Sequence, residues 1–375
     1  MSVVASSIDV RVATSTDDPD LRRLLRENPM RGEISVSLER EPDVFLAGST
    51  EGERHHTIVA RDCVQGRTVG MASRSVYSGF LNGEPASLGY LGQLRVDRVY
   101  RGRVGLLSKG YALMRSLRAP GDLPFDLTSI VADNTIARRV LGAGLTDLPM
   151  YRELEPFTTL MLPLWKRRHS RRSAAVHIER GSIERMADVA DCLERNRVRY
   201  QFAPRWTRGD LLSPERSRGL TPRDFLIAER DGRIIGCLAL WNQSSFKQIV
   251  VRDYGPTMRR WRPLAEVAAR LLGTPRLPNP GRPISHVYLS HVAVDDDRAE
   301  VFEALLARAY NEACDEGHAC LVVGFADRHP FLPIVTRNYR SWIYSSVLYA
   351  VCWENGQAAL EGIDRRVPHL EVGLL

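Results

Sequence analysis

The chain offers one clear candidate for an anion-binding site, the short basic turn Arg101-Gly102-Arg103. An extended apolar segment at 90–96 precedes this turn, and apolar residues at helical spacing from Leu106 to Leu117 follow it. The first turn of a helix leaves backbone N–H groups unpaired, and these groups attract anions. Glycine lets the backbone approach a ligand closely, and the two arginines add charge-assisted hydrogen bonds. The spacing therefore predicts a site for a phosphate group at the start of this helix.

The elements that would hold this turn alternate between strands and helices. A strong two-residue hairpin signal, Asn82-Gly83, precedes the extended segment. A second helix is expected at 134–141, capped by Asp133 or Asn134 and closed by the glycines that follow it. Further strands are expected at 8–12, 45–47, 57–61, 71–76, 126–131 and 158–164.

The second half of the chain repeats two features of the first half. Tyr288–Val294 has the same Tyr-Leu-x-x-(Leu/Val)-x-Val form as Tyr90–Val96. Residues 231–236 and 65–70 share the form x-Gly-Arg-x-(Ile/Val)-Gly. Two matches in the same order, each in a strand–helix setting, favour an internal duplication over chance.

The two copies differ where a ligand would bind. Three consecutive carboxylates, Asp295–Asp297, follow the strand of the second copy, whereas the first copy has its basic turn there. Each close approach of a like charge costs on the order of a few kcal/mol at an effective dielectric constant of about 20. Carboxylates at this place favour the dipole of the chain's own helix instead. We therefore expect the second copy to lack the anion site, and we expect no metal at the triplet.

At these residues the chain resembles the GCN5-related N-acetyltransferase superfamily. That family binds the pyrophosphate of acetyl-CoA on a turn with the pattern Gln/Arg-x-x-Gly-x-Gly/Ala. Arg101 takes the first position here, whereas Val104 stands where the pattern has glycine, and a glycine comes one residue later. The resemblance implies a phosphate-binding set formed by Arg101, Gly102, Arg103, Val104, Gly105 and Leu106.

The same resemblance implies a fold and its boundaries. Each half is expected to be a domain with a mixed, mostly antiparallel twisted sheet flanked by helices, which is an α/β (α+β) architecture. The N-terminal domain, residues 1–165, would hold acetyl-CoA. The C-terminal domain, residues 174–375, would shape the substrate cleft without a working acetyl-CoA site. Residues 166–173 are charged and without apolar periodicity, and we interpret them as a linker.

The family also has a strand that splays from its neighbour and bonds the pantetheine arm. By position, four residues form that strand here: Gln93, Leu94, Arg95 and Val96. A backbone N–H near Leu94 would polarise the thioester oxygen. Asn134 matches an asparagine that approaches the CoA arm in the family, and it is equally suited to cap a helix. Leu141 takes the position of the tyrosine that commonly protonates the departing thiolate, and leucine cannot donate a proton.

The sequence leaves the catalytic residues open. A base must take a proton from the attacking ammonium group, directly or through water. Tyr90, Gln93 and Glu84 lie on or near the right strand, and Tyr151 is the nearest aromatic hydroxyl after Leu141. Tyr90 and Tyr151 are therefore the catalytic candidates, with packing as the alternative role for both.

Composition bounds the class of protein. The 375 residues, 44% of them hydrophobic, suit a globular protein of about two domains. The net charge is +7, but residues 166–172 carry five of the positive charges, so no specific nucleic-acid partner is expected. No apolar run approaches the roughly 20 residues of a membrane span, and the first residues do not match a signal peptide. Six scattered cysteines fit a reducing compartment, so we expect a cytoplasmic protein without a membrane partner.

No metal site is expected elsewhere. Adjacent His55 and His56 would point to opposite faces of an extended segment, so we expect a surface turn there rather than a metal site. His291 takes the place of Gln93 in the second copy, as a core residue or a pocket residue.

The leading hypothesis is an acetyl-CoA-dependent N-acetyltransferase in which the amine of a small molecule or peptide attacks the thioester directly. Two alternatives stay open. One is a catalytically silent acyl-CoA-sensing or partner-binding protein, which Val104 and Leu141 favour, and the other is a longer-chain N-acyltransferase. Loops at 31–43 and 78–89 and the insertion at 244–283 would form the acceptor pocket. The sequence predicts neither the acceptor nor the oligomeric state.

Overall fold

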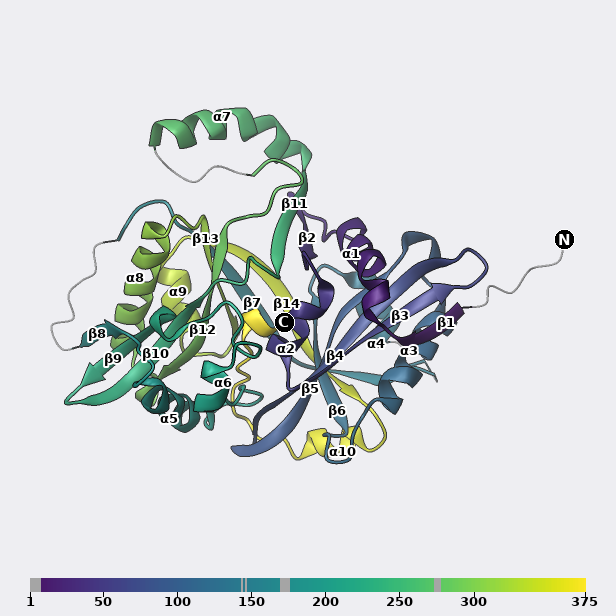
Figure 1. Ribbon diagram of the computed structural model, residues 1–375, viewed down its shortest axis with the longest axis horizontal. Coiled ribbons are helices and arrows are strands. Elements are labelled where there is room, and N and C mark those ends of the chain that lie inside the picture. The colour runs from purple at the N-terminus through teal and green to yellow at the C-terminus, as the bar shows by residue number, and fades with distance from the viewer. Residues whose placement is uncertain (1–7, 143, 146, 169–175, 273–277) are drawn as a thin grey trace.

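The computed structural model describes residues 8–142, 144–145, 147–168, 176–272 and 278–375 (Figure 1). Residues 169–173 of the predicted linker lie outside the described residues, as do residues 1–7. The strands are β1 (Ile8–Val12), β2 (Ile34–Glu39), β3 (Arg54–Asp62), β4 (Arg67–Leu81), β5 (Glu84–Val96), β6 (Phe125–Val131), β7 (Met150–Pro163), β8 (His177–Arg180), β9 (Phe225–Arg230), β10 (Arg233–Trp241), β11 (Gln248–Tyr254), β12 (His286–Val294), β13 (Cys320–Ala326) and β14 (Trp342–Cys352). The helices are α1 (Asp18–Glu27), α2 (Gly48–Glu51), α3 (Val104–Ser116), α4 (Thr135–Gly142), α5 (Met186–Arg197), α6 (Arg208–Leu212), α7 (Pro256–Leu272), α8 (Ala299–Asp315), α9 (Leu332–Asn338) and α10 (Gly356–Glu361).

One large sheet runs through the whole molecule. Twelve strands form it in the order β1-β3-β4-β5-β6-β14-β7-β13-β12-β10-β9-β8, and β2 pairs with β11 in a separate small sheet. The β5–β6 and β12–β13 pairs are parallel, and the other neighbours in the large sheet are antiparallel. The predicted α/β class, with a mixed and mostly antiparallel sheet flanked by helices, is confirmed.

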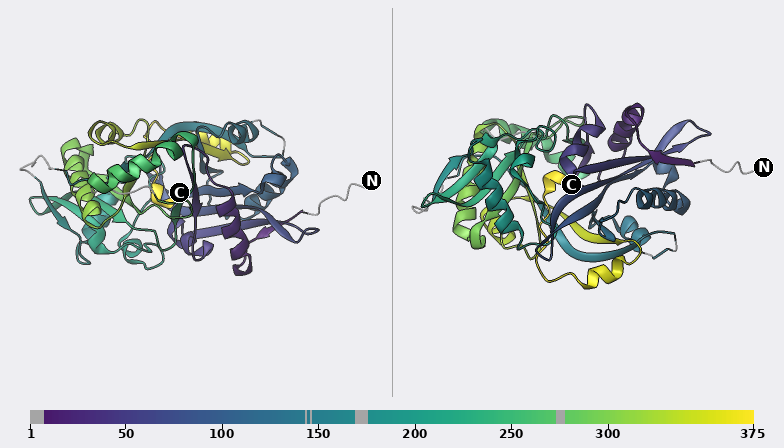
Figure 2. Two further views of the ribbon diagram at one scale, coloured as in Figure 1. Left: turned by 90° about the horizontal axis from the view of Figure 1, so that it is seen from above. Right: turned by 60° about the horizontal axis from the view of Figure 1, so that its bottom comes forward.

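The two halves of the chain exchange their last strands. β14, near the C-terminus, lies between β6 and β7, and it pairs with β6 from Ser346 opposite Val131 to Cys352 opposite Phe125. β7, the last strand before the predicted linker, pairs on its other edge with β13 of the second half. Neither half of the sheet is therefore completed by its own strands alone. Figure 2 shows the two halves side by side along this continuous sheet.

Helices cover both faces of the sheet. In the first half, α3 and α4 pack on one face through Tyr111 and Leu141, and α1 packs on the opposite face through Leu21, Leu24 and Leu25. In the second half, α8 and α5 likewise lie on opposite faces. No helix in the described ranges combines the length and apolar character that crossing a bilayer requires.

One local prediction is wrong. Residues 45–47 were expected to form a strand, but Val44–Ala47 forms a 3₁₀ turn. The Asp43 carboxylate accepts a hydrogen bond from the backbone N–H of Phe45 at 2.8 Å, which caps this turn. The following helix, α2, then brings Glu51 over the sheet beside β3 and β4.

The strand exchange predicts that the two halves unfold together. Leu348 lies on β14 in the central core and is 1% exposed, so Leu348→Ala should lower the free energy of unfolding by about 2–5 kcal/mol. Because β14 belongs to the second half and pairs with two strands of the first half, one cooperative transition should shift as a whole in denaturant unfolding followed by circular dichroism and tryptophan fluorescence. Ile343→Ala, on the same strand at 62% exposed, is the matched control and should change stability by less than about 0.5 kcal/mol. Two separate transitions, of which only one shifts, would contradict the prediction.

Candidate functional site

The strand β5 leaves its neighbour β6 halfway along its length. It stays antiparallel to β4 from Glu84 to Val96, whereas its parallel pairing with β6 covers only Gly89 and Tyr90. Gln93 has a φ of 53°, and the register with β4 shifts beside it, which marks a β-bulge. Within the described part of the chain, β6 pairs with no residue of Gln93–Val96, so no strand covers this backbone edge, although the Leu94 and Val96 carbonyls accept hydrogen bonds from Arg95 and Arg101.

The basic turn joins this splayed strand to α3. Tyr100 anchors it, since its buried hydroxyl donates to the Asp62 carboxylate at 2.6 Å. The Arg101 guanidinium donates to the side-chain oxygen of Asn28 at 2.7 Å, and the Arg103 guanidinium lies 4.4 Å from the centre of the Tyr100 ring. These contacts hold both arginines at the first turn of α3.

The start of α3 is open in spite of the departures from the family pattern. Gly102 has a φ of 83°, a left-handed conformation that favours glycine. A Cβ atom built at Gly102 or Gly105 would meet no heavy atom within 4 Å. Val104 is 40% exposed at the first position of the helix. The space beside Gly102 and Gly105 is therefore open, and two cationic residues lie on the turn before α3, an environment that suits a phosphate.

The equivalent region of the second half is filled by the chain itself. Asp295 accepts hydrogen bonds from Arg195 at 2.9 Å and Asn196 at 2.7 Å, and Asp297 accepts from Arg199 at 2.8 Å. We had expected these carboxylates to act on the dipole of their own helix, but they pair with side chains on and after α5 and cap no N–H group of α8. The carboxylates are therefore neutralised by neighbouring cations.

A second internal contact closes the bulge of the second half. His291 has the same φ of 53° as Gln93, and its backbone N–H donates to the Glu371 carboxylate at 2.9 Å. The buried Arg197 guanidinium pairs with the same carboxylate. In the second half, the Glu371 carboxylate thus accepts a hydrogen bond from the backbone N–H of the bulge residue. The corresponding bulge residue of the first half is Gln93. His291 itself is buried against Trp206, which identifies it as a core residue.

The two tyrosine candidates lie on opposite faces of the sheet. The Tyr90 hydroxyl bonds to the Ser129 hydroxyl at 2.7 Å, and burial raises the pKa of Tyr90 to about 12. The Tyr151 hydroxyl bonds to that of Tyr111, and burial raises the pKa of Tyr151 well above its usual value. Both hydroxyls keep their protons at neutral pH, so each is suited to donate a proton rather than to accept one. Their catalytic role stays a prediction.

Leu141 and Asn134 have clear structural roles. Leu141 is 6% exposed in a cluster that also contains Tyr111 and Tyr151, so two tyrosines lie around the position that lacks the family's own. The Asn134 side-chain oxygen accepts a hydrogen bond from the backbone N–H of Ala137 at 3.1 Å, which caps α4. The capping role is therefore present, and a contact with the CoA arm stays a prediction.

A buried charged cluster lies on the α1 face of the sheet, and sequence reasoning did not identify its members. The Glu51 carboxylate pairs with Arg40 and with Lys247 at 3.0 Å, and a ring nitrogen of His55 lies 3.6 Å from it. Burial alone raises the pKa of Glu51, but the charges of Arg40 and Lys247 outweigh it and lower this pKa to about 2. Arg40 and Lys247 belong to the predicted acceptor loops, 31–43 and 244–283. The sequence thus indicated these two loops but not the charged residues within them.

His55 corrects another expectation. It was predicted to lie in a surface turn, but it lies on β3 with its side chain bonded to the Ser75 hydroxyl at 2.8 Å. Burial lowers the pKa of His55 to about 4, so the imidazole is neutral at pH 7. Within the described residues no group of His, Cys, Asp and Glu side chains is arranged to hold a metal ion.

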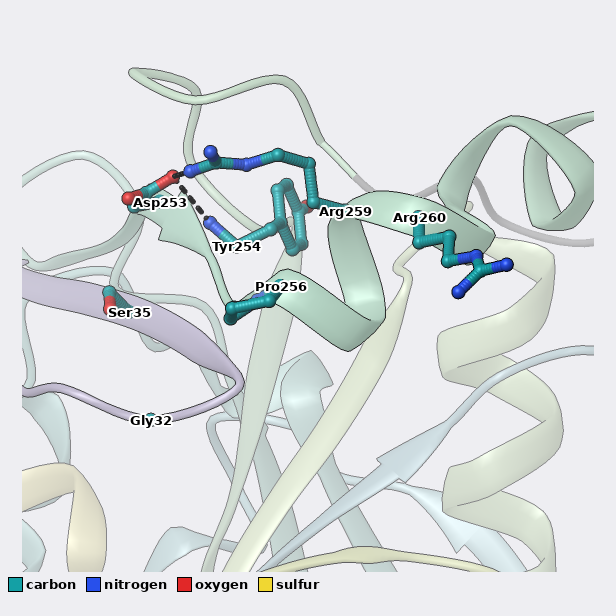
Figure 3. Close-up of a pocket in the computed structure, with 8 residues that line it drawn as sticks. Gly32, Ser35, Asp253, Tyr254, Pro256, Arg259 and Arg260 are labelled. Atoms are coloured by element: carbon teal, nitrogen blue, oxygen red, sulfur yellow. Dashed lines mark hydrogen bonds and ion pairs between the residues drawn. The ribbon is translucent and has the colours of Figure 1, made fainter.

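A cavity of about 580 Å³ lies away from these residues, at the base of α7 (Figure 3). Asp253, Tyr254, Pro256, Arg259 and Arg260 line much of it, and the Asp253 carboxylate pairs with Arg259 at 2.7 Å. None of its lining residues comes from β5, β6 or α3. The cavity is therefore separate from the splayed strand and the basic turn.

Comparisons with known proteins identify the fold. Neither a protein-family model nor a curated protein matches the sequence. A GCN5-related N-acetyltransferase from Sphaerobacter thermophilus has a TM-score of 0.55 at 14% identity, over 92% of this chain and 95% of that chain. N-myristoyltransferase from Saccharomyces cerevisiae with bound myristoyl-CoA has a TM-score of 0.59 at 12% identity, over 94% of this chain and 80% of that chain.

A third likeness is to the GCN5-related glucosamine N-acetyltransferase region of a fungal multi-domain β-N-acetylglucosaminidase. Its TM-score is 0.59 at 16% identity, and the match covers 93% of this chain but only 38% of that chain. The protein therefore has the GCN5-related N-acetyltransferase fold, which N-myristoyltransferase shares. The resemblance inferred from the basic turn is confirmed at the level of the fold.

The charged cluster predicts a large stability effect. Glu51→Gln would leave the buried cations Arg40 and Lys247 without their carboxylate partner, which should cost about 3–5 kcal/mol in the free energy of unfolding. Denaturant unfolding at pH 7 measures it. Glu27→Gln is the matched control, because Glu27 pairs with Arg23 at 2.8 Å but is 50% exposed. The control should cost less than about 1 kcal/mol. Equal effects of the two substitutions would show that the cluster does not stabilise the fold.

Proposed function

We propose that the protein is an acyl-CoA-dependent N-acyltransferase that moves an acetyl group from acetyl-CoA to an amine. The observation that carries this proposal is the splayed strand β5 leading into an open cationic helix start. Backbone groups of Gln93–Val96 without a strand partner in β6 suit the amides of a pantetheine arm. The first N–H groups of α3, with Arg101 and Arg103 beside them, suit a pyrophosphate. Both features lie on one continuous stretch of chain, so a single extended ligand reaches both.

In the proposed reaction the substrate amine attacks the thioester carbonyl carbon directly. The new C–N bond forms, the C–S bond breaks, and the proton lost by the amine is balanced by one taken up at the departing sulfur. The backbone N–H near Leu94 would stabilise the negative charge that develops on the carbonyl oxygen. Tyr90 and Tyr151 keep their protons at neutral pH and would serve as donors. Much of the rate enhancement in such a reaction comes from positioning the amine and the thioester together.

We propose that the acceptor enters from the α1 face of the sheet. The helix α3 covers the opposite face, where Leu106 packs with Val96. The charged cluster around Glu51 and the loop 31–43 lie on the α1 face, beside β3, β4 and β5. A small-molecule or peptide amine would meet this cluster before it reaches the thioester. No metal takes part in the proposed mechanism.

A longer-chain acyl donor is the second candidate. It is favoured by the likeness to N-myristoyltransferase, whose structure holds myristoyl-CoA. The choice between the donors is testable by comparing kcat/KM for acetyl-CoA and for myristoyl-CoA with the same amine. A catalytically silent acyl-CoA-binding protein is the third reading, favoured by Leu141 in the place of the family's tyrosine. Release of CoA in the presence of amines would exclude it.

The donor site predicts a specific loss of binding. The double substitution Arg101→Gln with Arg103→Gln should weaken acetyl-CoA binding at least roughly 100-fold, because each charged hydrogen bond contributes about 1.5–3 kcal/mol where it is desolvated. Isothermal titration calorimetry should give one acetyl-CoA per chain for the unmodified protein. Arg139→Gln, an exposed arginine of α4, is the matched control and should bind normally.

Two results would contradict this prediction. A stoichiometry of two would show that the second half also binds the donor. Unchanged affinity in the double variant would place the phosphates elsewhere. Absence of any acyl-CoA binding to the unmodified protein would overturn the proposed function itself.

A further inference from the structure

Arg95 lies on the acceptor side of the splayed strand. It is directly opposite Met71 in the β4–β5 pairing, and residues that are directly opposite share a face of the sheet. Met71 packs with Leu21 and Leu24 of α1. The next residue, Val96, packs with Leu106 of α3 on the other face. Arg95 therefore points away from the helix whose start would bind the phosphates of the donor.

Arg95 is a cation without a counter-charge. Its guanidinium has one hydrogen bond, to the carbonyl oxygen of the adjacent Leu94 at 3.0 Å, and no carboxylate of the described residues forms an ion pair with it. Burial lowers the pKa of Arg95, and the nearby charge of Arg40 adds to this effect. The Arg95 side chain is half-buried and its hydrogen bond is exposed, so the guanidinium is accessible to a ligand. Arg101 differs because its guanidinium donates to the side-chain oxygen of Asn28 at 2.7 Å.

The surroundings of Arg95 suit a small polar ligand. Tyr344 of β14 lies close enough for its hydroxyl to interact electrostatically with Arg95, and this hydroxyl contacts the sulfur of Met30 at 2.9 Å. Burial raises the pKa of Tyr344 to about 12, so it is a neutral hydrogen-bond donor. The Glu51 carboxylate, by contrast, is already shared by Arg40 and Lys247. The Arg95 guanidinium and the Tyr344 hydroxyl together present several hydrogen-bond donors and no negative charge.

We propose that Arg95 binds a carboxylate of the acceptor, so that the substrate is an amine that also carries a carboxylate, of the amino acid type. This inference rests on the proposed N-acyltransferase function and specifies its substrate class. Arg95 follows directly after Leu94, whose N–H region would hold the thioester oxygen, so the carboxylate would bind next to the reacting carbon. A guanidinium bonds a carboxylate through two parallel N–H groups, which fixes the orientation of the substrate. Its role is to position the substrate amine toward the thioester.

Matched pairs of acceptors test the proposal. Release of CoA from acetyl-CoA would be measured with the twenty amino acids and with their carboxamides, which keep the amine but lack the negative charge. The unmodified protein should use its best amino acid with a kcat/KM at least about 10-fold above that of the matching amide. Arg95→Gln should reduce this preference to under about 3-fold, and Arg95→Lys should keep part of it. Arg139→Gln, remote on α4, should leave the preference unchanged.

A separate measurement of acetyl-CoA binding distinguishes this inference from the proposed function. Calorimetric titration with acetyl-CoA should give the same affinity, within about 2-fold, for Arg95→Gln and the unmodified protein, because Arg95 faces away from α3. Equal use of acids and amides, acylation of amides alone, or a preference that survives in Arg95→Gln would each overturn the carboxylate inference while acyl-CoA binding stands. So would binding of acetyl-CoA without acylation of any amino acid. Failure to bind acetyl-CoA at all would instead overturn the proposed function.

Discussion

The pairing of β14 between β6 and β7 is the constraint on which the rest of the structure depends. Because each half supplies a strand to the other, the interior of the sheet has no free strand edge between the halves. The two halves cannot rotate against one another without breaking a full ladder of backbone hydrogen bonds. Buried side-chain contacts between the halves, such as the ion pair of Lys247 with Glu51, then add to a geometry that the backbone has already fixed.

The same pairing explains why the opening beside β5 persists. β6 pairs with β5 at two residues only, but with β14 at seven, from Phe125 to Val131. β6 is therefore held by the strand on its far side, while β5 is held by β4 and by the bulge at Gln93. The gap between β5 and β6 is maintained because each of these strands is held by the hydrogen-bond ladder on its other side. A preformed opening of this kind needs little reorganisation when a ligand enters.

Features with a local signature were predictable from the sequence. The hairpin at Asn82-Gly83, the strand ending at Val96, the helix after the basic turn and the Asn134 cap all follow from residues close together in the chain. The exchange of strands was not predictable, because the pairing of β14 with β6 joins segments that share no local pattern. For the same reason sequence reasoning missed the ion pair of Glu51 with Lys247. The 3₁₀ turn at Val44–Ala47 was missed because a short apolar run resembles a strand.

The contact between Glu371 and the bulge of the second half has a thermodynamic consequence. A ligand stabilises the state that binds it in proportion to its concentration relative to its dissociation constant. In the second half the bound group is part of the chain, so its effective concentration is constant and its stabilisation is always present. The first half has no such internal substitute at Gln93 within the described residues, and its local stability would follow the supply of donor. In the first half the proposed donor would supply the corresponding stabilisation only when it is bound.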